Sequence, residues 1–222
     1  MKTNKWDKYH TTHYHSLSGE WSRLDVERYK QWYFSWLNYL QSTCSIFQKK
    51  LDIFEIGSGV GAMAELLREQ GHNITGSDIS PYIVSCANKL CAPIRFLACD
   101  IQNRIPLKKK FDVVLGLEVI EHVPDVQKAL RVIHTALNDN GYFIGTTPYP
   151  FKKNFIDKTH VNVKYPDEWR EEFRKAGFSD VAVHPMSFLP FLWRINKRLN
   201  PVLPFYMSWP YFVSTSLIVA KK

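Results

Sequence analysis

The sequence predicts an α/β protein in which a mostly parallel sheet is covered by helices on both faces. The clearest sign is the segment 51–68, where an apolar, β-prone run leads into three alternating glycines and then a helix-forming run. Strand-like and helix-like stretches alternate as far as residue 148, the pattern of parallel strands joined by helices. The 222 residues suffice for one such domain with a full core.

An amphipathic helix is predicted before the sheet, over residues 22–41. Its aromatic and leucine residues recur at steps of three and four, which gives the helix one apolar face. The run from Ser22 to Asp25 resembles a capping box, with Asp in place of the usual Glu. We therefore expect the helix to begin at Ser22.

A glycine-rich turn joins the first strand to the next helix. Gly57, Gly59 and Gly61 lack a Cβ, so the backbone can approach a ligand closely, and free N–H groups at the helix start face that ligand. The carboxylate of Glu55, just before the loop, would repel a pyrophosphate and attract a cation. A dinucleotide stays open on spacing alone, because Ala62 suits the glycine-or-alanine position of that fingerprint.

The remaining elements follow in order along the chain. Four strands are predicted over residues 73–78, 94–101, 111–118 and 141–148. The helix after the third of these has a buried stripe of Val126, Leu130, Ile133 and Leu137. A further helix over 167–176 ends with Gly177 as its C-cap, and strands over 180–183 and 212–220 complete the sheet.

The pattern E-x-G-x-G-x-G from Glu55 to Gly61 resembles the first motif of the class I S-adenosylmethionine-dependent methyltransferases. Five motifs between residues 51 and 148 have the order and spacing of that family. The resemblance implies a Rossmann-like sheet of seven strands, with an antiparallel last strand inserted beside the fifth.

The same resemblance implies roles for individual residues. Glu55 would sit near the ammonium group of S-adenosylmethionine, Asp78 would hold the ribose hydroxyls, and Asp100 would accept from the adenine amino group. The full set of implied cofactor contacts is Glu55, Gly57, Ser58, Gly59, Gly61, Asp78, Ile79, Asp100, Ile101 and Glu118.

The segment Glu118-x-x-Glu121-His122 follows the fourth strand, at the edge of the sheet where ligands of such folds bind. E-x-x-E-H is similar to a segment of small-molecule methyltransferases, including ubiquinone-pathway O-methyltransferases. The resemblance implies that this segment lines the acceptor pocket. His122 is the first candidate for the general base, His160 is the second, and Glu121 is the third residue of the expected catalytic group. The small-RNA 3′-end ribose methyltransferases carry the same segment and a later histidine as metal ligands. A site for Mg²⁺, Mn²⁺, Fe²⁺ or Zn²⁺ made by Glu118, Glu121, His122 and His160 therefore stays open.

Composition restricts the surroundings of the protein. The net charge of +8 suggests an anionic partner or a diffuse solubilising charge. Four cysteines without a C-x-x-C pair favour reduced thiols, and no apolar signal core or membrane-length run is present. These observations predict a cytoplasmic protein.

Three regions are expected: an N-terminal helical lid over 1–45, a core over 46–184 and 213–222, and an insertion over 185–212. The insertion is rich in aromatic and basic residues and contains no acid. Its alternatives are a cap on the core, a homodimer contact, an acceptor pocket, a docking site on an anionic membrane, and a contact with single-stranded nucleic acid.

The expected function is methyl transfer from S-adenosylmethionine to a small-molecule acceptor, at an oxygen. A metal-dependent RNA 3′-end ribose methyltransferase is one alternative, although the sequence shows no RNA-binding module. The other is a cofactor-binding partner subunit without catalysis.

Overall fold

The computed structural model describes residues 20–189, 196, 201–209 and 211–222. Most of the segment 1–21, and with it much of the expected lid, lies outside the described residues. No described helix is both long enough and apolar enough to cross a membrane.

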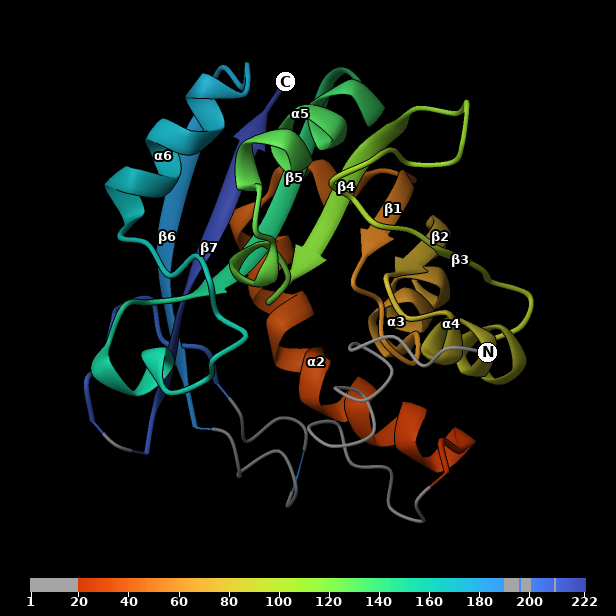
Figure 1. The fold of residues 1–222 in the computed structure, drawn as a ribbon. Coiled ribbons are helices and arrows are strands. Elements are labelled where there is room, and N and C mark those ends of the chain that lie inside the picture. The colour runs from red at the N-terminus through yellow and green to blue at the C-terminus, as the bar shows by residue number, and fades with distance from the viewer. Residues whose placement is uncertain (1–19, 190–195, 197–200, 210) are drawn as a thin grey trace.

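Seven strands form one sheet in the order β3-β2-β1-β4-β5-β7-β6 (Figure 1). Their bounds are β1 Asp52–Ile56, β2 Asn73–Asp78, β3 Arg95–Ala98, β4 Phe111–Leu117, β5 Leu137–Pro148, β6 Val181–Phe188 and β7 Val213–Lys221. The first five pair in parallel, whereas β7 runs antiparallel to both β5 and β6. This confirms the predicted Rossmann-like sheet, including the insertion of the last strand beside the fifth.

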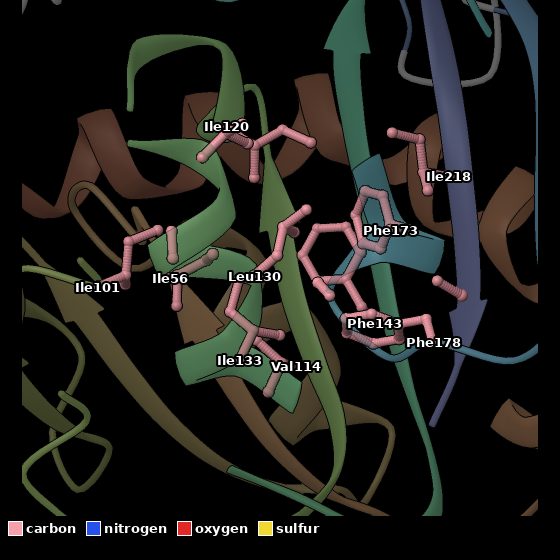
Figure 2. Packing of buried hydrophobic residues seen from close by; sticks show 14 of the residues in the cluster. Ile56, Ile101, Val114, Ile120, Leu130, Ile133, Phe143, Phe173, Phe178 and Ile218 are labelled. Carbon is pink, nitrogen blue, oxygen red and sulfur yellow. The ribbon is translucent and has the colours of Figure 1, made fainter. Parts of the chain in front are cut away.

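Helices cover both faces of the sheet. The α-helices are α2 Arg23–Thr43, α3 Ala62–Glu69, α4 Pro81–Leu90, α5 Val126–Ala136 and α6 Pro166–Lys175. The short 3₁₀ helices are η1 Ser45–Gln48, η2 Ile120–His122 and η3 Lys152–Phe155. Helices α5 and α6 pack on one face, where Leu130, Ile133 and Phe173 meet Val114 and Phe143 (Figure 2). On the other face α2 and α3 pack against β1, β4, β5 and β7.

Helix α2 begins where the sequence predicts. Ser22 is its N-cap: the Ser22 side chain accepts from the N–H of Asp25, and the Asp25 carboxylate accepts from the N–H of Ser22 at 2.9 Å. The capping box is therefore confirmed with Asp in the Glu position.

Several elements differ from the predicted bounds, and β3 covers only Arg95–Ala98 of the expected 94–101. Leu137, expected in the preceding helix, is the first residue of β5, with extended backbone (φ −80°, ψ 144°). Leu137 is fully buried, as its position in the apolar stripe of the preceding helix predicts, but its backbone is not helical.

Strand β6 extends to Phe188, five residues past the expected end of the strand and three past the expected start of the insertion. Pro185 does not stop it, because β6 is the last strand of the sheet and a missing N–H is tolerated at an edge. Phe188 is buried against Trp32 and Trp36 of α2, with ring centroids 5.1 and 5.0 Å away, which anchors the added residues.

Candidate active site

The glycine loop after β1 depends on glycine at three positions. Gly57, Gly59 and Gly61 all have positive φ, a conformation that other residues rarely adopt. A Cβ on Gly57 would lie 2.3 Å from Cγ2 of Val119, and one on Gly61 would lie 2.7 Å from Cζ of Phe96. The loop can therefore pass close to its neighbours only with glycine at these positions.

Asp78 holds the glycine loop in place from the end of β2. Its two carboxylate oxygens accept from the N–H groups of Gly59, at 3.1 Å, and of Ser80, at 3.0 Å. Each oxygen has a further lone pair, so the carboxylate can also accept from a ligand. The chain thus presents a charged acceptor between the loop and the start of α4.

A cavity of about 380 Å³ opens beyond the carboxyl ends of β1 to β4. Eight of the expected cofactor residues line it: Gly57, Ser58, Gly59, Asp78, Ile79, Asp100, Ile101 and Glu118. Gly61 and Glu55 do not line it. Three aromatic side chains that were not predicted as site residues also line it, Trp21, Tyr29 and Tyr33. Tyr29 and Tyr33 lie on the apolar face of α2, and helical periodicity does not distinguish a core residue from a cavity residue.

Glu55 lies behind the loop and is only 4% exposed. Burial, together with the charge of Asp78, raises the pKa of the Glu55 carboxyl to about 8. Among the described residues its Oε2 has no hydrogen-bond partner. The carboxyl is therefore largely protonated near neutral pH in the free protein.

The edge of the sheet where β4 and β5 end, called the rim below, carries the acidic–histidine cluster. Glu118 is the first residue past β4 and has a left-handed backbone, with φ of +53°. Its N–H donates to the carbonyl of Thr146, and the hydroxyl of Thr215 lies 2.7 Å from its Oε1. The side chain of Glu118 is thus held toward β7, a contact between residues 97 positions apart that no local sequence pattern indicates.

Glu121 lies in the 3₁₀ turn η2 and is fully buried. Neither carboxylate oxygen has a hydrogen-bond partner within the described part of the chain. Burial, and then the neighbouring Glu118, raise the pKa of the Glu121 carboxyl well above its usual range. A buried carboxyl without partners is costly unless a ligand, ion or water satisfies it.

His160 returns to the rim beside His122, as the sequence predicts. The Glu121 carbonyl accepts from the N–H groups of Val161 and Asn162, both at 2.9 Å, and so fastens the later segment to η2. The two imidazole rings lie 4.8 Å apart between centroids.

Each of the two imidazoles has its Nδ1 against a backbone carbonyl. Nδ1 of His122 lies 3.1 Å from the Thr159 carbonyl and Nδ1 of His160 lies 2.8 Å from the Asn154 carbonyl. A carbonyl only accepts, so each Nδ1 carries the proton and each Nε2 presents its lone pair. Burial, with a contribution from His160, lowers the pKa of His122 to about 4, so His122 is neutral at physiological pH.

Three of the four residues expected to hold a metal come together. Ligand atoms of Glu121, His122 and His160 all lie within 4.8 Å of one another, whereas Glu118 is not part of this group. Nε2 of His122 is 3.7 Å from Oε1 of Glu121. Only His122 of these three also lines the large cavity, so it stands between the cavity and the buried carboxyl.

The chain is similar to known methyltransferases. The model of the methyltransferase domain family matches residues 27–183. A ubiquinone biosynthesis O-methyltransferase of Cereibacter sphaeroides is 31% identical over 164 residues, covering 64% of this chain and 66% of the relative. One of Rickettsia canadensis is 33% identical over 111 residues, which is 48% of this chain and 47% of the relative. The chain thus spans slightly under two thirds of the first relative and about half of the second.

Solved structures show the same fold. An S-adenosylmethionine-dependent methyltransferase of Archaeoglobus fulgidus superimposes with a TM-score of 0.64 at 20% identity, covering 99% of this chain and all of the other. The magnesium protoporphyrin IX methyltransferase of Synechocystis, solved with bound S-adenosylmethionine, gives 0.61 at 18% identity over 99% and 92% of the two chains. With the family match over residues 27–183, the glycine loop and the strand order, this chain belongs to the class I S-adenosylmethionine-dependent methyltransferases.

Proposed function

We propose that this protein transfers the methyl group of S-adenosylmethionine to an oxygen atom of a small-molecule acceptor at the rim. S-adenosylmethionine would supply an electrophilic methyl group on a sulfonium, held in the cavity by the residues that line it. The observation that carries the proposal is His122, a neutral imidazole that lines this cavity and whose Nδ1 is held by the Thr159 carbonyl.

His122 would remove the proton of the acceptor hydroxyl as the oxygen forms its bond to the methyl carbon. The proton passes to Nε2, because Nδ1 already holds one. The Glu121 carboxyl lies 3.7 Å from Nε2, beside the nitrogen that receives the proton. The relatives named as O-methyltransferases support oxygen as the acceptor atom.

The His122→Ala variant tests this role. We expect turnover to fall about 100-fold or more, because a general base is lost, while affinity for S-adenosylmethionine changes little. The assay follows S-adenosylhomocysteine formed by purified protein with phenolic and catecholic acceptors. Near wild-type turnover in the variant would show that another group removes the proton.

The same assay distinguishes the two alternative functions. Product formed by the purified chain alone argues against a non-catalytic partner subunit. An RNA oligonucleotide with free 3′-terminal hydroxyls, offered in place of the small acceptor, tests the RNA-end activity. The proposal would be contradicted if the protein methylated that RNA but methylated none of the small acceptors.

As an alternative to His122 acting as a metal-free base, we propose a divalent metal ion held by Glu121, His122 and His160. The support is chemical: two imidazoles have their Nε2 atoms directed by carbonyls, and the buried Glu121 carboxyl is without partners in the described residues. A metal would lower the pKa of an acceptor hydroxyl. Metal added to chelator-treated protein should raise the melting temperature, and Glu121→Gln should abolish that rise. Equal melting temperatures with and without metal would leave His122 as a plain base.

We propose that α2 forms part of a lid over the cofactor. Tyr29 and Tyr33, which lie four residues apart on this helix, line the cavity opposite the glycine loop residues. The lid expected over 1–45 also includes residues 1–19, which lie outside the described part of the chain.

A further inference from the structure

Exposed apolar side chains gather on two segments at the end of the molecule beyond β5. The first segment, 151–165, exposes Phe155, Ile156, Val161 and Tyr165. The second, 201–212, exposes Phe205, Trp209 and Tyr211. Ile156 is 78% exposed and Trp209 is 65% exposed, so these side chains contribute little to the core. Large apolar patches of this kind usually mark an interaction site.

The two segments form one surface. The rings of Tyr149 and Tyr206 lie 3.9 Å apart between centroids, and the N–H of Tyr149 donates to the carbonyl of Ser214 at 3.1 Å. The Lys153 ammonium donates to the carbonyl of Phe212. Figure 1 shows both segments together at the lower left, past the ends of β5 and β7. We call this surface, made of residues 151–165, 201–209 and 211–212, the apolar–basic face.

Its charge is positive. Residues 151–165 carry four lysines, Lys152, Lys153, Lys158 and Lys164, against one acid, Asp157, and residues 201–212 carry no charged residue. Lys152 and Lys158 are exposed and form no ion pair within the described part of the chain. Asp157 accepts from the N–H and the hydroxyl of Thr159, at 2.8 and 2.7 Å, and so turns part of its charge inward.

We propose that the apolar–basic face docks on an anionic lipid bilayer. Exposed aromatic and aliphatic side chains bury themselves at the level of the headgroups, and lysines beside them are attracted to anionic lipid. A two-fold dimer through the same face would instead bring its own lysines together, which is unfavourable. Both the apolar and the charged components of the face therefore fit a bilayer better than a second copy of the chain.

The apolar–basic face is connected to the rim by a hydrogen bond. The carbonyl of Asn154, in η3, accepts from Nδ1 of His160 at 2.8 Å, so the segment that carries Phe155 and Ile156 also positions a histidine of the candidate site. Docking would turn the rim toward the bilayer. This inference goes beyond the proposed reaction and does not depend on the identity of the acceptor.

Sedimentation with vesicles tests the proposal. The protein should pellet with phosphatidylcholine vesicles that contain phosphatidylglycerol, and much less with phosphatidylcholine alone or at high salt. The variant Lys152→Glu/Lys158→Glu should lower the partition coefficient at least about thirtyfold, since each lysine near a charged surface contributes about 1 kcal/mol. Ile156→Ser and Trp209→Ser should each lower it by about tenfold.

Matched controls lie at other places on the molecule. Lys108→Glu/Lys110→Glu makes the same change in net charge in the loop that leads into β4, at the opposite end of the sheet. Leu24→Ser removes a side chain that is 64% exposed at the start of α2. Both should bind vesicles like the wild type, and circular dichroism verifies the fold of every variant. The proposal fails if the face variants and the controls bind equally, or if light scattering shows a dimer that Ile156→Ser dissociates while vesicles bind none of the proteins.

Discussion

Glu118 adopts a left-handed backbone, which costs a residue with a Cβ of the order of 1 kcal/mol or more. The conformation persists because its N–H bonds to Thr146 and its carboxyl contacts Thr215. Glu118 is not part of the group formed by Glu121, His122 and His160. The prediction of a four-residue metal site was therefore wrong for Glu118 and leaves three residues together.

Asp78 is expected to control cofactor affinity. The Asp78→Asn variant should weaken binding of S-adenosylmethionine at least about tenfold, because a charged acceptor facing the cavity is lost. Isothermal titration calorimetry measures this directly. Asp139→Asn, at an exposed side chain of the opposite end of the sheet, should bind like the wild type. Tight binding of NAD in place of S-adenosylmethionine would contradict the assignment of the cavity.

Glu55 should make the stability of the ligand-free protein depend on pH. Its pKa is raised to about 8, against an ordinary value of about 4.3 in the unfolded chain. The folded state thus holds the proton more tightly, so stability is greatest below about pH 4 and falls as the pH rises through 8. Glu55→Gln keeps a neutral side chain at every pH. Relative to the wild type, the free energy of unfolding of this variant should rise between pH 4 and 8, by up to about 5 kcal/mol. Parallel urea-unfolding curves at all pH values would show that Glu55 is not held neutral.

At the level of elements, α2 is attached to the core through a buried charge. Glu65 of α3 is almost fully buried, and its carboxylate accepts from the guanidinium of Arg23, with Oε2 2.6 Å from the nearer nitrogen. Lys30 lies 3.7 Å from the same carboxylate. Because α2 also supplies Tyr29 and Tyr33 to the cavity, this contact fixes one wall of the site.

Arg23→Ala should lower the free energy of unfolding by about 1–2 kcal/mol, since it leaves Glu65 with Lys30 alone, and about half of the Arg23 side chain is in water. It should also weaken cofactor binding. The control Glu69→Gln breaks only the exposed pair with Lys30 and should cost less than about 0.5 kcal/mol. Urea unfolding measures both. Equal losses in the two variants would mean that the buried position of Glu65 adds nothing.

An element can be predicted from the sequence when the residues that determine it are close to one another along the chain. The capping box of α2 and the glycine loop are set by neighbouring residues, and both were predicted correctly. The extension of β6 to Phe188 depends on pairing with β7 and on Trp32 and Trp36, which are distant in sequence, so local patterns missed it. His160 was predicted at the rim because topology returns every segment after a parallel strand to the same edge.

For the molecule as a whole, ligand binding should raise the melting temperature. A ligand at a concentration of a hundred times its Kd stabilises the folded state by about 2.7 kcal/mol. For a chain of this size that corresponds to a rise of roughly 5–10 °C. S-adenosylhomocysteine should produce this rise in differential scanning fluorimetry and NAD should not. A rise with NAD alone would mean that the Rossmann-like sheet holds a dinucleotide.

The antiparallel strand β7 also determines when the fold can be completed. It lies between β5 and β6, and its partners include residues 142–148 and 181–188. On the ribosome, β1 to β5 and their helices leave the exit tunnel first, while β6 has no neighbour to pair with. The edges of β5 and β6 stay unpaired until Val213–Lys221 pairs with both strands and joins them in one sheet. We therefore expect the contact from Thr215 to Glu118 at the rim to form only after β7 has left the exit tunnel.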